Sequence, residues 1–192
     1  MKFTDTQGES QRARNRRLKE GFFDEFCVGR GLDIGAGRDP LFEDIETWDY
    51  DRGNGDATLM DGVENCSYDY VYCSHILEHL KNPWKGVANW FRILKDGGYL
   101  IVAVPHRDLY EKKLELPSNW NPDHKTYWLL ERHTNPFTLG LIQTVQEALT
   151  GVDYAIIQAR VMMRGLVHGN DPTKHSWGEY SCEIVVKKGK LI

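Results

Sequence analysis

The sequence has little of several features that would assign it to other classes of protein. It has only four cysteines, no two of which form a Cys-x-x-Cys pair, so the spacing indicates neither a zinc knuckle nor a redox dithiol. It has no apolar signal segment at its N-terminus and no apolar run long enough to cross a bilayer. Positive charge is not in excess either, because 24 lysines and arginines face 28 aspartates and glutamates. We therefore predict a cytoplasmic protein that binds neither membranes nor nucleic acids in general.

The chain does have enough apolar residues for one domain. Its 192 residues, 41% of them hydrophobic, suit a single globular domain that spans residues 1–192. One basic cluster lies near the N-terminus and comprises Arg12, Arg14, Arg16, Arg17 and Lys19. We interpret this cluster as the solvated face of a helix over residues 11–26. The alternative is a contact with an anionic substrate.

The most informative segment is a short apolar strand, 31–34, followed by a glycine-rich turn. Gly35 and Gly37 let the backbone bend tightly and let a ligand lie directly against it. In an open α/β sheet, such a turn at the carboxyl end of a strand is where nucleotide-like ligands bind. A dinucleotide fingerprint would have a third glycine where this chain has Pro40. The carboxylate of Asp33, inside the motif, suits a cationic ligand better than a diphosphate.

Strand and helix patterns alternate after this turn, which predicts a parallel sheet with right-handed crossovers. We expect the further strands over residues 46–49, 57–60, 68–73, 99–104, 154–161 and 179–187, with a helix over 138–150. At the end of the second strand, the carboxylate of Asp49 can accept both hydroxyls of a ribose. The ring of Tyr50 can lie against a purine.

Five motifs in this order make the chain resemble the class I S-adenosylmethionine-dependent methyltransferases. They are Leu32-Asp33-Ile34-Gly35-Ala36-Gly37, Asp49, Gly55-Asp56-Ala57, the pair Tyr68-Asp69 with Ser74-His75-Ile76-Leu77-Glu78-His79, and Leu94-Lys95-Asp96-Gly97-Gly98. The resemblance covers residues 31–104. Two departures stand out: Asp39 replaces the third glycine of many members, and the segment 41–44 leaves little room for the usual first helix.

The resemblance implies an α/β fold with a doubly wound, mostly parallel, seven-stranded sheet of the Rossmann-like methyltransferase type. It also implies S-adenosylmethionine as the cofactor. The residues that it assigns to cofactor binding are Asp33, Gly35, Ala36, Gly37, Asp49, Tyr50, Asp56, Ala57 and Ser74. For Asp56 and Ala57 the alternative is a plain turn.

Four histidines are candidates for catalysis, because imidazole titrates near neutral pH. They are His75, His79, His106 and His124. The first two belong to a His-x-x-Glu-His sequence, which is also the signature of inverted zinc peptidases. We expect no metal, because this motif follows a buried strand and no third ligand follows at a telling spacing. The alternative for each histidine is a packed or surface side chain.

Residues 105–136 interrupt the alternation with four prolines and several aromatic residues. A connection of this length inside a domain is usually functional, so we predict an inserted cap region after the fifth strand that forms part of the acceptor pocket. A homodimer contact is the alternative. The insertion mixes aromatic residues with His124, Lys125, Arg132 and His133, which suits a polar small molecule, including an anionic one, with a sugar or nucleotide part. We predict methyl transfer to a small polar acceptor such as a sugar- or nucleotide-linked glycan precursor. The alternatives are a protein or RNA methyltransferase and a non-catalytic binder that keeps the cofactor fold.

Overall fold

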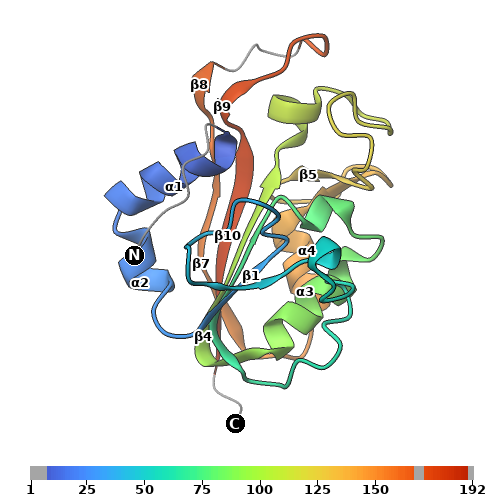
Figure 1. Ribbon diagram of the computed structural model, residues 1–192. Coiled ribbons are helices and arrows are strands. Elements are labelled where there is room, and N and C mark those ends of the chain that lie inside the picture. The colour runs from blue at the N-terminus through green and yellow to red at the C-terminus, as the bar shows by residue number, and fades with distance from the viewer. Residues whose placement is uncertain (1–7, 167–170, 190–192) are drawn as a thin grey trace.

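A mixed six-stranded sheet forms the centre of the molecule (Figure 1). The computed structural model describes residues 8–166 and 171–189. Within the sheet, β1, β2, β3 and β4 are parallel, and β10 is antiparallel to both of its neighbours. The order across the sheet is β2 (Glu46–Trp48), β1 (Gly31–Ile34), β3 (Tyr68–Ser74), β4 (Leu94–Pro105), β10 (Ser181–Lys188) and β7 (Tyr154–Val161).

The prediction of seven strands was wrong, because residues 57–60 form a turn and not a strand. Side chains of the helix α3 (Pro83–Arg92) donate hydrogen bonds to the backbone carbonyls of this segment. The indole nitrogen of Trp90 donates to the carbonyl of Ala57 at 2.8 Å, and the amide of Asn89 donates to the carbonyl of Thr58 at 2.8 Å. Since these acceptors are already bonded, the segment does not pair with β2 as a further strand.

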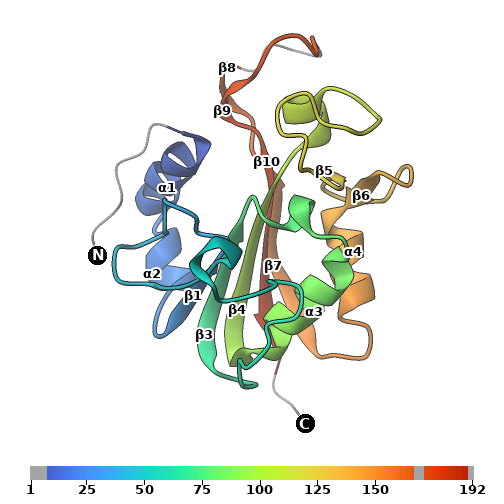
Figure 2. The same cartoon turned by 45° about the vertical axis from the view of Figure 1, so that its right-hand side comes forward.

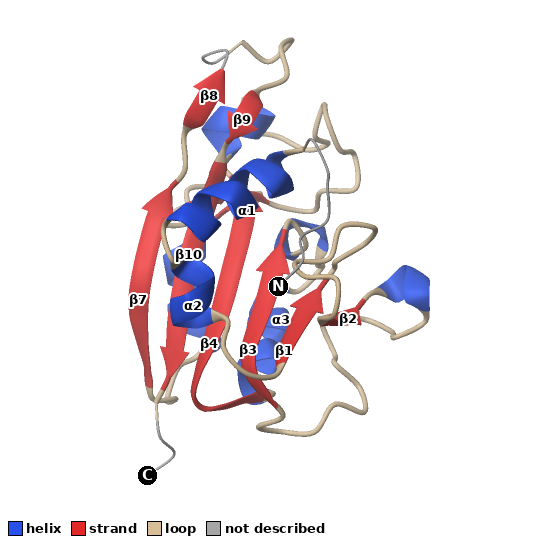
Figure 3. Ribbon diagram, turned by 60° about the vertical axis from the view of Figure 1, so that its left-hand side comes forward, coloured by secondary structure: helices blue, strands red, loops and turns tan. Residues whose placement is uncertain are grey.

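Helices cover both faces of the sheet, as Figure 2 shows. On one face lie α1 (Glu9–Lys19) and α2 (Phe22–Phe26); on the other lie α3 (Pro83–Arg92) and α4 (Leu141–Ala148). Figure 3 shows α1 and α2 in front of the strands and α3 behind them. The predicted helix over residues 11–26 is two helices, because Gly21 adopts a left-handed conformation with φ +71° between them.

The connection from β1 to β2 contains turns but no helix. This agrees with the expectation that residues 41–44 leave little room for one. The face that such a helix would cover is occupied by aromatic residues of α2 and by the connection itself. Phe22, Phe23 and Phe26 pack there with Leu41 and Phe42 in a second core. Burial of this apolar surface fixes the glycine-rich turn after β1, residues 35–40, against the sheet. This segment is called the cofactor turn below.

Three of the five residues of the basic cluster of α1 are buried, which corrects the interpretation from the sequence; Arg12 and Lys19 are exposed as expected. Arg16 and Arg17 are 4% and 1% exposed, and both turn toward the sheet. Arg16 donates to Glu179 at 2.6 Å, and Arg17 donates to Glu183 on β10 at 2.7 Å. Burial raises the pKa of Glu183, but the charges of both arginines outweigh it and hold that pKa below its ordinary value. Arg14 is also buried, and its guanidinium bonds Asp39 at 2.8 Å.

Residues 105–136 lie beyond the carboxyl end of β4. They include the π-helical turn η3 (Arg107–Glu111) and β5 (Tyr127–Leu129), which pairs in parallel with β6 (Thr138–Gly140). The segment is anchored, since Tyr127 and Trp128 are fully buried. A separate hairpin joins β8 (Arg164–Leu166) to β9 (Trp177–Glu179). Among the described residues, no helix has the length and apolar character needed to cross a membrane.

Candidate cofactor and acceptor site

The turn after β1 has a geometry that glycine alone satisfies at one position. Gly35 has φ +74° and its N–H donates to the carbonyl of Trp48 at 2.8 Å. A methyl group added at Gly35 would lie 2.8 Å from Cβ of Ile76, which belongs to the chain leaving β3. The backbones after the first and third strands therefore approach closely at the point where the sheet order reverses, which is where ligands of such sheets bind.

Asp49, at the end of β2, holds this turn in place. Its Oδ2 accepts the N–H of Gly37 at 2.8 Å, and its Oδ1 accepts the N–H of Asp51 at 2.9 Å, which caps the short helix η1 (Tyr50–Arg52). Arg52 donates back to the carbonyl of Gly37 at 2.6 Å. Each carboxylate oxygen has a second lone pair, so Asp49 still has acceptor capacity toward a ligand.

A cavity of about 670 Å³ opens beside this turn. A volume of this size is in the range of small-molecule sites. Of the predicted residues, it is lined by Gly35, Asp49, Tyr50, Asp56, Ala57, His75 and His79. Residues that the sequence did not single out also line it, namely Trp48, Asp51, Thr58, Ile76, Leu80, Lys81 and Asp123. The ring of Tyr50 is 77% exposed at the rim.

A second, smaller cavity of about 70 Å³ shares Gly35 with the first. The predicted residues Asp33, Ala36 and Ser74 line it, together with Arg14 of α1. The Asp33 carboxylate is buried and accepts the N–H of Leu41 at 2.7 Å. Burial raises the pKa of Asp33 to about 7, and the charges of neighbouring aspartates add to the rise.

His75 lies between two carboxylates. It follows β3 with φ +57°; its Nε2 is 3.2 Å from Glu9 of α1, and its Nδ1 is 3.5 Å from Glu78. Burial lowers the pKa of His75, but the two carboxylates more than reverse this and raise it to about 10. The ring is therefore protonated at neutral pH, and it does not serve there as a general base.

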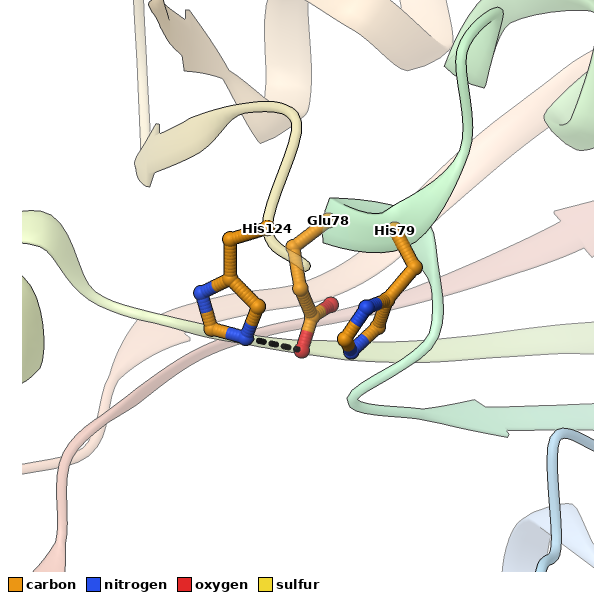
Figure 4. A group of neighbouring side chains, drawn as sticks. All are labelled: Glu78, His79 and His124. Carbon is orange, nitrogen blue, oxygen red and sulfur yellow. Dashed lines mark ion pairs between the residues drawn. The ribbon is translucent and has the colours of Figure 1, made fainter. Parts of the chain in front are cut away.

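His79 and His124 come together from different parts of the chain, as Figure 4 shows. His79 ends the short helix η2 (Leu77–His79), and His124 belongs to the inserted segment. Their ring centroids are 4.8 Å apart. The insertion is tied to η2 by a hydrogen bond of 2.8 Å from the N–H of Lys125 to the carbonyl of Glu78. The structure thus places part of the insertion beside the large cavity.

His106 is not among the described residues that line either cavity. Its Nδ1 accepts the N–H of Asp108 at 3.1 Å and so caps η3. Burial lowers the pKa of His106. The position supports a structural role for this histidine at the start of the insertion.

Several carboxylates around the histidines were missed at the sequence level. Glu9 and Glu111 carry no local signal, because each acts on a histidine that is distant along the chain. Asp123 is adjacent to a predicted catalytic histidine, and its position within Asn121-Pro122-Asp123-His124-Lys125 was the available clue.

Comparison with known proteins identifies the family of this chain. The sequence profile of the methyltransferase domain family matches residues 8–158. That match covers well over half of the chain, so the protein belongs to this family. It is an S-adenosylmethionine-dependent methyltransferase, which confirms the resemblance seen in the sequence. No curated protein sequence matches the chain.

Solved structures share the fold at low sequence identity. A S-adenosylmethionine-dependent methyltransferase of Thermotoga maritima, a possible histamine N-methyltransferase, has a TM-score of 0.59 at 20% identity and covers 94% of this chain and 91% of its own. A methyltransferase of Archaeoglobus fulgidus has a TM-score of 0.56 at 15% identity, with 94% and 95% covered. The [4+2]-cyclase SpnF has a TM-score of 0.51 at 13% identity, with 91% and 82% covered. Because fold does not determine substrate, these likenesses carry the architecture alone.

Proposed function

We propose that the protein transfers the methyl group of S-adenosylmethionine to a small polar acceptor bound in the large cavity. The observation that carries this proposal is the continuous wall of the cavity of about 670 Å³. It runs from Gly35 and Asp49 at the cofactor turn to His75 and His79 at the end of β3. A cofactor and a small acceptor held along one such wall can react without a large rearrangement.

The two cavities suggest how the cofactor lies. Its adenosine end would occupy the rim near Asp49, Tyr50 and Asp56, where a carboxylate and an exposed ring are available. Its amino acid end would reach across Gly35 into the small cavity beside Asp33. The sulfonium would then lie over the Gly35 backbone, with its methyl group toward the histidine side of the large cavity.

Positioning is the main contribution that this chain must make, because the methyl group on a sulfonium is already activated. A hydroxyl acceptor must also lose its proton. His75 already carries a proton at neutral pH, so proton removal falls to other groups that line the cavity, namely His79 and Asp123. An amine acceptor would need less help once it is neutral.

The charges around the cavity narrow the class of acceptor. Four aspartates, one lysine and the protonated His75 line it, so the lining is acidic. Two basic residues of the insertion have partners within the protein: Lys125 bonds Asp123 at 2.7 Å, and a ring nitrogen of His133 lies 3.1 Å from Glu147. These contacts support a neutral or cationic acceptor over an anionic one. The lining favours a neutral sugar or an amine over a phosphate-bearing nucleotide, and it does not favour RNA.

A transfer assay tests the proposal. Protein and S-adenosylmethionine carrying a labelled methyl group are incubated with sugars and sugar-linked glycan precursors, nucleotide-linked sugars, small amines, peptides and RNA. We expect label on a neutral sugar or an amine, and loss of transfer in Asp49→Ala but not in Asp61→Ala, a matched control at an exposed aspartate outside the cavity. Transfer to RNA or to peptides alone would overturn the choice of acceptor. Cofactor binding without transfer to any acceptor would favour the non-catalytic binder.

A further inference from the structure

Three potential metal ligands converge beside the large cavity (Figure 4). Glu78, His79 and His124 each offer one ligand atom, and these atoms all lie within 4.8 Å of one another. Two of the residues come from η2 and one comes from the insertion. His79 also lines the cavity, so the cluster borders the space in which an acceptor would bind.

Both histidines of the cluster are oriented by a carboxylate on the same ring atom. Nδ1 of His79 lies 2.8 Å from Asp123, and Nδ1 of His124 lies 2.5 Å from Glu111. If each Nδ1 carries the proton that the carboxylate accepts, each ring presents a bare Nε2 on its other side. A carboxylate behind a histidine is the usual arrangement for a histidine that binds a metal, because it fixes the tautomer and raises the basicity of the free nitrogen.

The third member, Glu78, has a buried carboxylate oxygen that the protein does not satisfy. The side chain is 1% exposed, and its Oε2 has no hydrogen-bond partner among the described residues. Its Oε1 lies 4.0 Å from Nε2 of His124 and 3.5 Å from Nδ1 of His75. An unsatisfied buried acceptor destabilises the fold, and more so when it is charged. A cation bound at this oxygen would remove this destabilisation.

The charged groups around the cluster also favour a bound cation. Four carboxylates face the three histidines, namely those of Glu9, Glu78, Glu111 and Asp123, whereas the lysine that faces them is Lys125. The carboxylates of this group therefore outnumber its lysine four to one. A divalent ion would offset this excess.

We propose that Glu78, His79 and His124 bind one divalent transition-metal ion. Two imidazoles and one carboxylate form a donor set that suits Zn²⁺ and similar first-row ions, whereas Mg²⁺ and Ca²⁺ prefer oxygen ligands throughout. In a tetrahedral site, ligand distances of about 2.1 Å place the ligand atoms about 3.4 Å apart. Binding would therefore draw these three atoms, which now lie within 4.8 Å of one another, together by up to about 1.4 Å.

This site differs from the one that the His-x-x-Glu-His pattern suggests. That pattern expects both of its histidines on one helix face as ligands. Here the left-handed conformation at His75 turns the first histidine toward Glu9, and His124 of the insertion takes its place. The expectation that no metal binds rested on the lack of a third ligand near the motif, and the fold supplies that ligand from a distant segment.

A role in methyl transfer follows, and it rests on the proposed function. Three protein ligands leave coordination positions open, and the cavity lies on the His79 side. An acceptor hydroxyl bound there would lose its proton to water more readily. Its oxygen would then attack the methyl carbon, and the carbon–sulfur bond would break to leave a neutral thioether.

Metal binding tests this site without any acceptor. Tag-free protein is stripped with a chelator and titrated with Co²⁺, followed by visible absorption, and with Zn²⁺, followed by calorimetry. Cys66, an exposed thiol, is replaced by serine in every sample so that it does not compete. We expect one tight site per chain, and binding of Mg²⁺ at least 100-fold weaker.

Three variants decide which residues hold the ion. Glu78→Gln keeps the shape of the side chain and should abolish stoichiometric binding. Asp123→Asn, at a carboxylate that is 66% exposed and so does not endanger folding, should weaken binding about 10- to 100-fold through His79. Asp61→Asn, the same change at an exposed aspartate outside the cluster, should bind normally. The site is refuted if the wild type binds neither ion, or if Glu78→Gln and Asp123→Asn both bind as the wild type does. Cofactor affinity, measured in parallel, separates this failure from failure of the proposed function.

Discussion

Replacement of Gly35 by alanine is the most direct test of the close approach at the cofactor turn. The position has φ +74°, and a left-handed conformation costs about 1–2 kcal/mol for a residue with a Cβ. The new methyl group would also lie 2.8 Å from Cβ and Cγ1 of Ile76 and 2.9 Å from its Cδ1. Overpacking of this kind typically costs a further 1–3 kcal/mol. We therefore expect Gly35→Ala to lower the free energy of unfolding by about 2–5 kcal/mol.

Gly37 provides a matched control two residues away. It also has a positive φ, +54°, but a methyl group there would meet no heavy atom within 4 Å. Gly37→Ala should therefore lose only the conformational part, about 1–2 kcal/mol. Urea denaturation of both variants measures the two losses side by side. Equal losses would show that no steric conflict with Ile76 exists and that the backbones are not in close contact at Gly35. We also expect Gly35→Ala to weaken cofactor binding more than Gly37→Ala does, which calorimetry can check.

Two further predictions concern the carboxylates of the cofactor site. Asp49→Ala should weaken S-adenosylmethionine binding by about 1.5–3 kcal/mol, the range for a hydrogen bond to a charged group; unchanged affinity by calorimetry in a folded variant would exclude Asp49 as the ribose contact. Because burial raises the pKa of Asp33 to about 7, the fraction of ionised Asp33 grows as the pH rises from 6 to 8, and affinity for the cationic cofactor should grow with it. Asp33→Asn should remove this increase; if wild type and variant show the same pH dependence of the dissociation constant, Asp33 does not sense the cation.

Much of the sheet could be predicted from local patterns. The strands β1 and β7 have the bounds that the sequence predicted, 31–34 and 154–161. In β1 an apolar run ends at a glycine, and in β7 an alternating run begins shortly after the turn at Gly151, so the signal is contained in the strand and its immediate flank. The cofactor turn was located for the same reason, since its glycines are adjacent to the strand that they end.

The predicted strand over residues 57–60 failed because its environment decides its structure. The short stretch Ala57-Thr58-Leu59-Met60 has the composition of a strand, yet Trp90 and Asn89 of α3 bond its carbonyls. These four residues alone give no information about which distant side chains will form hydrogen bonds with their backbone carbonyls. Short apolar runs are therefore poor predictors when a helix packs over them.

The candidate site was likewise predictable only where the signal is local in the sequence. The stretch from Asp33 to Gly37 was recognised from its sequence, whereas the carboxylates that control the histidines were not. Glu9 lies in α1 and Glu111 in the insertion, so the proximity of each to a histidine depends on the complete fold. The pattern His-x-x-Glu-His predicts that both histidines lie on one helix face. In the structure His75 has a positive φ and lies outside the helix η2, so the two histidines do not share such a face. Such backbone conformations are not encoded in a local pattern of polar and apolar residues.

The burial of Arg16 and Arg17 has a consequence for the order in which the protein is made. Their carboxylate partners, Glu179 and Glu183, come more than 160 residues later in the chain. A ribosome releases the N-terminal helix long before it makes these partners, and an arginine is costly to bury without a countercharge. Until β10 exists, Arg16 and Arg17 therefore stay in water, and a free segment of 11 residues is only marginally helical there. The helix α1 takes its native place only once β10 has been synthesised, so the first helix of the chain is among the last elements to dock.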